Sequence, residues 1–426
     1  MKNYKTHIMA IVSFLFLMSC NNMLDEYPHS AIAPDAVKDS DLPALENGMY
    51  NRVQNMPRES FIFNDLMGGL IQGSTHSSAG ELINLLTQIE NATTLSVYRG
   101  YFPALGQVTN VLNVTSKMGT STLVDKAKGT AHFFRAYIYL NLVTHWGDVP
   151  IVERATSELV SRNPAAEVWQ FIDRDIDNAI ALLRPLDDVG DYYYASQDAA
   201  LALKARILLY EGKKTEAVQI AEGLIAKPRF ALDDFDKIFR KEPNTEIIFA
   251  FENVTEESSV AVSELFYNYA HPNKGSWFYR PTVAIPSLFS DEDNRKVISW
   301  DVFGGQNCFN KYPSGQTGKD PVILSRIAEL YLISAEAQGL PGISRLNELR
   351  RKRGLSDVAA PATEDEYLTL ILEERTKEFL TEGHRWYDLV RTGRGSEIGL
   401  RDAQHLLPIP EAERILNPNL GQNKGY

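Results

Sequence analysis

The chain has 426 residues, 44% of them hydrophobic, so it can bury a substantial core in one large domain or in two or three smaller ones. Its 55 acidic and 43 basic side chains give a formal net charge of −12, and an acidic surface repels phosphate backbones, which argues against nucleic acid as a partner. Two cysteines are too few for a disulfide framework.

Residues 1–19 are typical of an export signal rather than of folded structure. A basic start precedes an apolar run over residues 8–17, which is too short for a resident transmembrane helix. The run ends in the letters LMSC, which resemble the bacterial lipobox, so Cys20 is the expected site of cleavage and lipid attachment. Such a lipid anchors a chain to a membrane without spanning it. The alternative is an ordinary secretory signal with an incidental cysteine. Residues 20–40 are expected to form a lipidated tether.

The next part of the chain predicts helices with polar connections. Residues 41–65 and 80–118 show moderate helical periodicity, and a polar glycine-rich run at 73–80 predicts a loop. Tyr98 and Tyr101 fall in what is either a second loop or a helix start. Residues 125–146 predict a helix that is apolar on nearly all sides and therefore central to the core. Residues 164–183 predict the following helix.

Two helix pairs resemble tetratricopeptide units. Residues 197–210 and 214–226 are joined by a tight turn at Gly212, with a proline soon after the second helix. Residues 322–338 and 341–352 predict a second pair with a shortened connection. For each pair, a plain helical hairpin is the alternative.

Residues 229–320 break the helical pattern. Residues 246–251 predict a short strand, and the segments after it are rich in Gly, Pro, Asn and aromatic residues. Long irregular insertions in a compact protein are usually functional. This stretch is therefore the expected source of ligand-binding loops.

Aromatic residues among small polar ones are typical of sugar sites, because sugar rings have apolar faces that stack on Trp and Tyr while neighbouring polar groups bond the hydroxyls. The alternative is that these rings hold loops in place or face a partner protein. The triplet Tyr192-Tyr193-Tyr194 also falls in a predicted loop. The candidate ligand-binding residues are Trp277, Tyr279, Arg280, Trp300, Asn310 and Tyr312, with Tyr98 added from the N-terminal half.

No enzyme motif is recognisable in the sequence. It contains no nucleophile elbow, no HExxH zinc motif and no P-loop, and its eight histidines are scattered. No catalytic residue, no metal site and no cofactor is therefore expected. A surface glycan-degrading enzyme remains as an alternative to a binding protein.

Residues 368–394 predict an amphipathic helix that ends near Gly393. Gly383 falls inside it at a cost of about 1 kcal/mol relative to Ala, which indicates a bend or a close backbone contact. Five residues could be misread as a catalytic cluster: Arg375, His384, Arg385, Asp388 and Arg391. Charged side chains at this spacing usually pair with one another, so they are expected to brace the structure.

Three strings resemble the SusD/RagB family of outer-membrane nutrient-binding lipoproteins. They are FFRAYIYLNLVTHWGDVPIV, EERTKEFLTEGHRWYDLVRTGR and the tail LLPIPEAERILNPNLGQNKGY, in which Lys424 stands where the family commonly has proline. The resemblance implies a mainly α fold: one large domain on irregular tetratricopeptide-like helix pairs, with inserted loops and a few short strands. It implies an N-terminal helical part at 41–228 and a C-terminal part at 229–426 with ligand loops and closing helices.

The resemblance also implies a function. Family members capture oligosaccharides outside a Bacteroidetes cell and deliver them to a SusC-like TonB-dependent barrel in the outer membrane. The lipid anchor is then expected on the extracellular side, although Asp25 and Glu26 come later after Cys20 than is usual for that export signal. Two alternatives remain: an oligopeptide-binding relative serving a peptide importer, and an adaptor that binds no ligand tightly.

Overall fold

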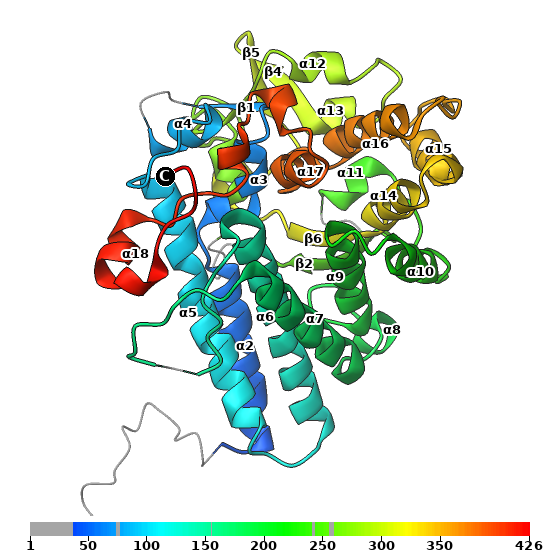
Figure 1. Ribbon diagram of the computed structural model, residues 1–426. Coiled ribbons are helices and arrows are strands. Elements are labelled where there is room, and N and C mark those ends of the chain that lie inside the picture. The colour runs from blue at the N-terminus through cyan, green and yellow to red at the C-terminus, as the bar shows by residue number, and fades with distance from the viewer. Residues whose placement is uncertain (1–36, 74–76, 155, 241–242, 255–259) are drawn as a thin grey trace, which may run out of the picture.

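The computed structural model describes residues 37–73, 77–154, 156–240, 243–254 and 260–426 (Figure 1). The export signal, Cys20 and most of the expected tether lie outside the described residues. The helices are α2 (Leu42–Gln54), α3 (Phe63–Leu66), α4 (Ser78–Ile83), α5 (Ala92–Thr115), α6 (Thr122–Trp146), α7 (Ala165–Leu182), α8 (Leu186–Val189), α9 (Gln197–Tyr210), α10 (Lys214–Ile225), α11 (Phe235–Ile238), α12 (Ile285–Leu288), α13 (Lys296–Ser299), α14 (Ile327–Gln338), α15 (Ile343–Lys352), α16 (Glu364–Glu378), α17 (Arg385–Arg391) and α18 (Glu411–Leu416). The strands are β1 (Ile71–Gln72), β2 (Ile247–Phe251), β3 (Arg280–Pro281), β4 (Trp300–Phe303), β5 (Gln306–Phe309) and β6 (Val322–Arg326).

Helix α6 is central, as its apolar sequence predicts. It begins three residues before the predicted start because the Ser121 hydroxyl accepts a hydrogen bond from the Val124 N–H at 3.2 Å and caps the helix. It packs between α5 and α7, and most of its side chains are buried. Among the described residues, no helix is both long enough and apolar enough to cross a membrane.

Helix α5 corrects the expectation of a loop or helix start around Tyr98. Asn91 caps the helix at its N-terminus, so Tyr98 lies inside a long helix that continues past Pro103. Gly100 is required by packing, because a Cβ there would lie 2.3 Å from the ring of Pro57. Gly100, which in the sequence suggests a break in the helix, therefore allows α5 to pack closely against Pro57.

Successive helices pack as a ladder of neighbours, α7 against α9, α9 against α10, α10 against α14 and α14 against α15. The first tetratricopeptide-like pair is confirmed with its helix ends within one residue. The start of the second pair is corrected, because residues 322–326 form strand β6 and the helix begins at Ile327. Strand β6 pairs antiparallel with β2, Val322 opposite Phe251, and both strands are fully buried.

The predicted helix over residues 368–394 is also corrected, since α16 and α17 are separate helices with an irregular link at 379–384. Gly383 has a φ of +79°, and a Cβ there would lie 2.5 Å from the Phe61 carbonyl oxygen, so the expected close backbone contact is confirmed. The Gly383 N–H donates to the Asp65 carboxylate at 2.6 Å. The link therefore holds α17 against the N-terminal part of the chain.

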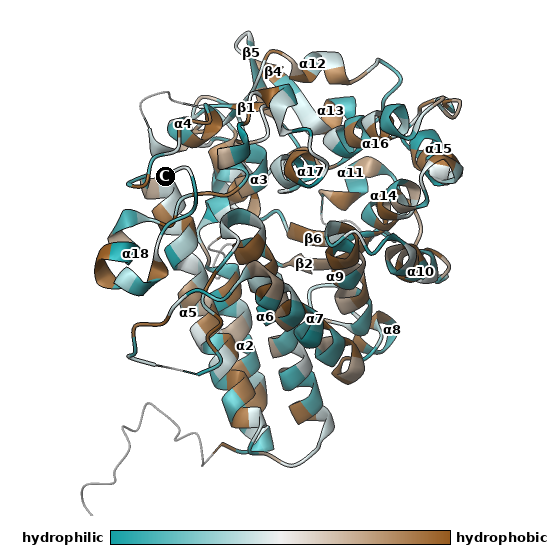
Figure 2. Ribbon diagram, in the orientation of Figure 1, coloured by the Kyte–Doolittle hydropathy of each residue, from teal (hydrophilic) through white to brown (hydrophobic). Residues whose placement is uncertain are grey.

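The larger of two hydrophobic clusters runs from Leu42 to Leu420 and includes residues from both halves of the chain, and a smaller one lies among α14, α15 and α16. Figure 2 shows β2 and β6 coloured as hydrophobic between the helices. The single large, mainly α domain expected from the resemblance is thus confirmed.

Candidate ligand-binding site

A short antiparallel pairing brings the N-terminal half to the irregular segment after β2. Strand β1 pairs with β3, Gln72 opposite Arg280, and the Gln72 side chain donates to the Pro281 carbonyl at 2.8 Å. A Cβ on Gly73 would lie 3.2 Å from the Phe278 carbonyl oxygen, so the chain after β1 passes close to residues 277–280. Segments from the N-terminal and C-terminal halves therefore meet at one surface, although the N-terminal segment there is β1 and not the helix that carries Tyr98.

Trp277 and Arg280 form the centre of this surface. The Arg280 guanidinium lies 4.7 Å from the centroid of the Trp277 ring, a cation–π contact. Trp277 is half-buried and has a φ of +50°, which is unusual for a bulky side chain. Backbone conformations of this kind concentrate at functional sites.

Three side-chain nitrogen atoms in this region have no hydrogen-bond partner among the described residues. They are the indole Nε1 of Trp277, the Nε of Arg280 and the indole Nε1 of Trp300. Each is a donor, and buried donors are normally satisfied.

Phe278 and Tyr279 face opposite ways, one toward the surface and the other toward the core. The Phe278 side chain is 56% exposed, whereas Tyr279 is 2% exposed and its backbone N–H donates to the Leu265 carbonyl. Burial raises the pKa of the Tyr279 hydroxyl, which lies 3.5 Å from a carboxylate oxygen of Glu59. Tyr279 therefore anchors the segment, and Phe278 presents the accessible ring. Sequence reasoning chose Tyr279 and missed Phe278, although alternation in an extended stretch was a signal that could have found it.

The β4–β5 hairpin lies beside this surface, with β5 packed against β3. Trp300 pairs with Phe309 across the hairpin and is half-buried against the core. The Asn310 side chain is occupied by the fold, because it accepts a hydrogen bond from the Tyr267 hydroxyl at 2.7 Å and donates to the Val297 carbonyl at 3.0 Å. Trp300 thus remains near the surface of the site, while Asn310 fixes the hairpin.

Two further candidate residues lie in the core. Tyr312 is 5% exposed, stacks on Phe266 and donates its hydroxyl proton to the Thr381 carbonyl at 3.2 Å. Tyr98 is 1% exposed and packs edge-on against Trp146 at 5.0 Å between centroids. The structure therefore brings Trp277 and Arg280 together, places Trp300 on the neighbouring hairpin and turns Tyr98, Tyr279 and Tyr312 inward.

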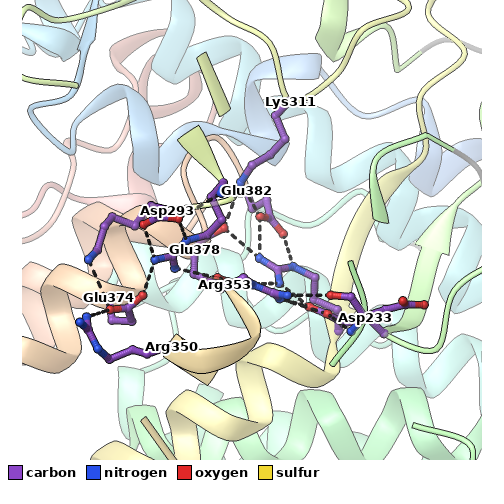
Figure 3. A network of polar contacts seen from close by, with 12 residues as sticks. Asp233, Asp293, Lys311, Arg350, Arg353, Glu374, Glu378 and Glu382 are labelled. Atoms are coloured by element: carbon purple, nitrogen blue, oxygen red, sulfur yellow. Dashed lines mark hydrogen bonds and ion pairs between the residues drawn. The ribbon is translucent and has the colours of Figure 1, made fainter. Parts of the chain in front are cut away.

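Residues that flank the β4–β5 hairpin take part in a buried ion-pair network with α16 (Figure 3). Glu378, at the end of α16, accepts from three guanidinium groups, those of Arg295, Arg326 and Arg353. Burial alone would raise the pKa of Glu378, but the three guanidinium groups hold that pKa well below its usual range. Lys311, just after β5, pairs with Glu382 at 2.8 Å. The network joins both ends of the hairpin region to α16 and so fixes the position of the candidate site.

The charged residues on α16 and α17 brace one another, as expected. Asp388 pairs with Arg375 and with Arg391, each at 2.7 Å and each buried. Burial, and after it the charge of Arg206, holds the pKa of His384 well below its usual value. Among the described residues, no three His, Cys, Asp or Glu side chains converge in a way that could hold a metal ion.

Two family models match the chain. Residues 22–209 match the family described as "Starch-binding associating with outer membrane", and residues 307–399 match the family described as "SusD family". A SusD-like protein of Formosa agariphila is 26% identical over the whole of both chains. The starch-binding protein SusD of Bacteroides thetaiotaomicron is 32% identical, over 34% of this chain and 29% of that protein.

Solved structures share the fold. A SusD superfamily protein from Bacteroides vulgatus has a TM-score of 0.80 at 21% identity and covers 91% of this chain and 99% of its own. The surface glycan-binding protein A from Bacteroides thetaiotaomicron, in complex with laminarihexaose, has a TM-score of 0.79 at 17% identity and covers 91% of this chain and all of its own.

Proposed function

Because this chain belongs to the SusD/RagB family, we propose that it is a cell-surface lipoprotein that captures oligosaccharides and delivers them to a SusC-like TonB-dependent transporter of the outer membrane. The observation that carries the proposal is the pairing of Trp277 with Arg280 on a surface to which both halves of the chain contribute. A protein of the same fold holds laminarihexaose, and a relative in sequence is named for starch binding, which supports a glycan as the ligand class.

The chemistry of the site suits capture rather than turnover. A sugar ring can stack on an indole, while the Arg280 guanidinium donates to its hydroxyl oxygens. Rigid rings lose little conformational entropy on binding, so a few of them can hold a flexible chain. The site as proposed consists of Trp277, Phe278, Arg280 and Trp300.

The location follows from the sequence before the described residues. The letters LMSC support lipid attachment at Cys20, and the first matching family is described as associating with the outer membrane. We place the folded part of the chain on the extracellular side, where it can meet glycans too large to diffuse through the membrane.

Trp277→Ala tests the proposed site. We expect this variant to bind an oligosaccharide such as laminarihexaose or maltoheptaose about tenfold more weakly, because loss of a stacking platform costs on the order of 1–3 kcal/mol. The half-buried ring should contribute little to the melting temperature. Isothermal titration calorimetry of the purified mature chain, with melting curves in parallel, measures both.

Leu416→Ala is the control, since Leu416 is an exposed apolar side chain on α18, an element outside the site. It should bind as the unaltered protein does. Equal affinity in Trp277→Ala and Leu416→Ala would show that the ligand does not contact Trp277.

A further inference from the structure

A separate hollow of about 520 Å³ lies between α2, the connection from α8 to α9, and the end of β2. It has no residue in common with β1, β3 or the β4–β5 hairpin. Its lining includes aromatic rings and neutral amides, those of Tyr193, Tyr194, Asn47, Asn51 and Gln54, together with one acidic residue, Glu252. A second hollow of about 600 Å³ adjoins it on the other side of Tyr194, which lines both. Both volumes are within the range of about 300–1,000 Å³ that is usual for small-ligand sites.

Tyr194 is the exposed ring between the two hollows. Its side chain is 45% exposed, the edge of the Tyr50 ring meets it at 6.0 Å between centroids, and the Lys126 ammonium lies 5.4 Å from its centroid. A large exposed aromatic side chain in a hollow, held from one side by its neighbours, has the form of a stacking platform.

The loop that carries Tyr194 is fixed at both of its ends. The Ala195 N–H donates to the Tyr50 hydroxyl at 2.6 Å, and the Ala250 N–H, on β2, donates to the Tyr192 carbonyl at 3.1 Å. Tyr192 and Tyr193 pack edge to face at 4.6 Å. The platform is therefore held in place before any ligand arrives, which lowers the entropic cost of binding.

Amides line the hollow along one face of α2. Asn47, Asn51 and Gln54 recur at spacings of four and three residues, so their side chains project on the same side of the helix. Gln54 is held by the Glu252 carbonyl and by Asn253. The Asn47 and Asn51 side chains are exposed and make no hydrogen bond to another described residue. Each can offer both a donor and an acceptor to a ligand.

We infer that this groove, defined by Asn47, Asn51, Gln54, Tyr193 and Tyr194, is a second oligosaccharide-binding site, distinct from the one at Trp277. An aromatic face bordered by neutral amides matches the apolar face and the hydroxyl edge of a pyranose ring. The inference rests on the proposed function only for the class of ligand. A second site gives a long polysaccharide two points of attachment, so it raises the apparent affinity for polymers more than for short fragments.

The test uses native affinity gels of the purified mature chain with a panel of soluble plant, algal and host polysaccharides, including laminarin and amylopectin. For the polysaccharide that retards the unaltered protein most, Tyr194→Ala should raise the apparent dissociation constant about tenfold. Trp277→Ala should keep residual retardation, and the double variant should lose it. Leu416→Ala is the control, and melting curves establish that each variant is folded.

The outcomes separate the two claims. Retardation of Tyr194→Ala equal to that of the unaltered protein overturns the second site, and leaves the proposed function standing if Trp277→Ala is weakened. If Tyr194→Ala loses binding and Trp277→Ala binds as the unaltered protein does, the second site is supported and the first is contradicted. If Tyr194→Ala binds glycan normally but no longer co-purifies with a barrel partner, the groove is a protein interface and the inference fails. A chain that no polysaccharide in the panel retards contradicts both claims.

Discussion

At the scale of single residues, the sequence selects the segment that carries the proposed site but does not show which of its rings face outward. Trp277 and Arg280 lie together at the surface, as a sugar site requires. Tyr279 and Tyr312 turn inward because their rings pack against distant segments and their hydroxyls lie near Glu59 and the Thr381 carbonyl. These partners are far away in the sequence, so residue type and loop composition alone do not distinguish an anchoring tyrosine from a binding one.

Asp65 gives a pH-dependent prediction at this scale. Burial, partly offset by the N–H of Gly383, raises the pKa of its carboxyl from 3.8 to about 7. Between these two values the folded chain holds a proton that the unfolded chain has lost. The contribution of the Asp65 carboxyl to the free energy of unfolding is therefore fully present below about pH 4 and is lost as the pH rises to about 7.

Asp65→Asn removes the charge and keeps an oxygen that can accept from the Gly383 N–H. We expect its free energy of unfolding to exceed that of the unaltered protein by up to about 4 kcal/mol at pH 8, and the difference to shrink toward zero at pH 4. Urea unfolding at pH 4, 6 and 8 measures this. A difference that does not change with pH would contradict the account of Asp65.

At the scale of elements, helices with clear apolar periodicity were predictable, and segments defined by distant pairing were not. The ends of α9 and α10 follow from their own sequence and turn. Residues 322–326 form a strand only because β2 supplies the opposite edge. Similarly, the break between α16 and α17 depends on the approach of Phe61 and Asp65 to Gly383.

A substitution of Glu378 tests how much the buried ion-pair network contributes to the free energy of unfolding. Glu378→Ala leaves Arg295, Arg326 and Arg353 without their shared buried acceptor, so we expect a loss of about 3–5 kcal/mol in the free energy of unfolding. Glu373→Ala is the matched control, because Glu373 is an exposed glutamate on the same helix, and its effect should stay within about 0.5 kcal/mol. Chemical unfolding measures both variants, and equal stability would show that the network contributes little.

At the scale of the whole molecule, two of the strings that resemble the family meet in space. The Asn423 side chain, in the tail, donates to the Trp146 carbonyl at the end of α6 at 2.9 Å, and the Trp146 indole donates to the Pro408 carbonyl at 3.1 Å. The tail therefore closes the domain on the central helix. The sequence could indicate the family from these strings, but the contacts between them appear only in the folded chain.

A substitution of Cys20 tests the proposed lipid anchor, which determines where the whole molecule is located. Cys20→Ala removes the sulfur to which lipid would be attached, so we expect the variant to leave the membrane fraction when it is expressed without a barrel partner. Fractionation with immunoblotting measures this, and metabolic labelling with a radioactive fatty acid reports acylation directly. Full membrane association of the unacylated variant would contradict the lipoprotein assignment.

We expect this chain to bind glycans through largely neutral contacts, and a comparison of ligand classes on the intact mature protein tests this. Calorimetry with oligosaccharide pools and with oligopeptide pools, each at 50 mM and 500 mM salt, separates the possibilities. We expect heat from an oligosaccharide pool and an affinity that changes little with salt, because screening weakens interactions between charges and not stacking. Binding that is strongest for charged peptides and falls steeply as the salt concentration rises would contradict the claim.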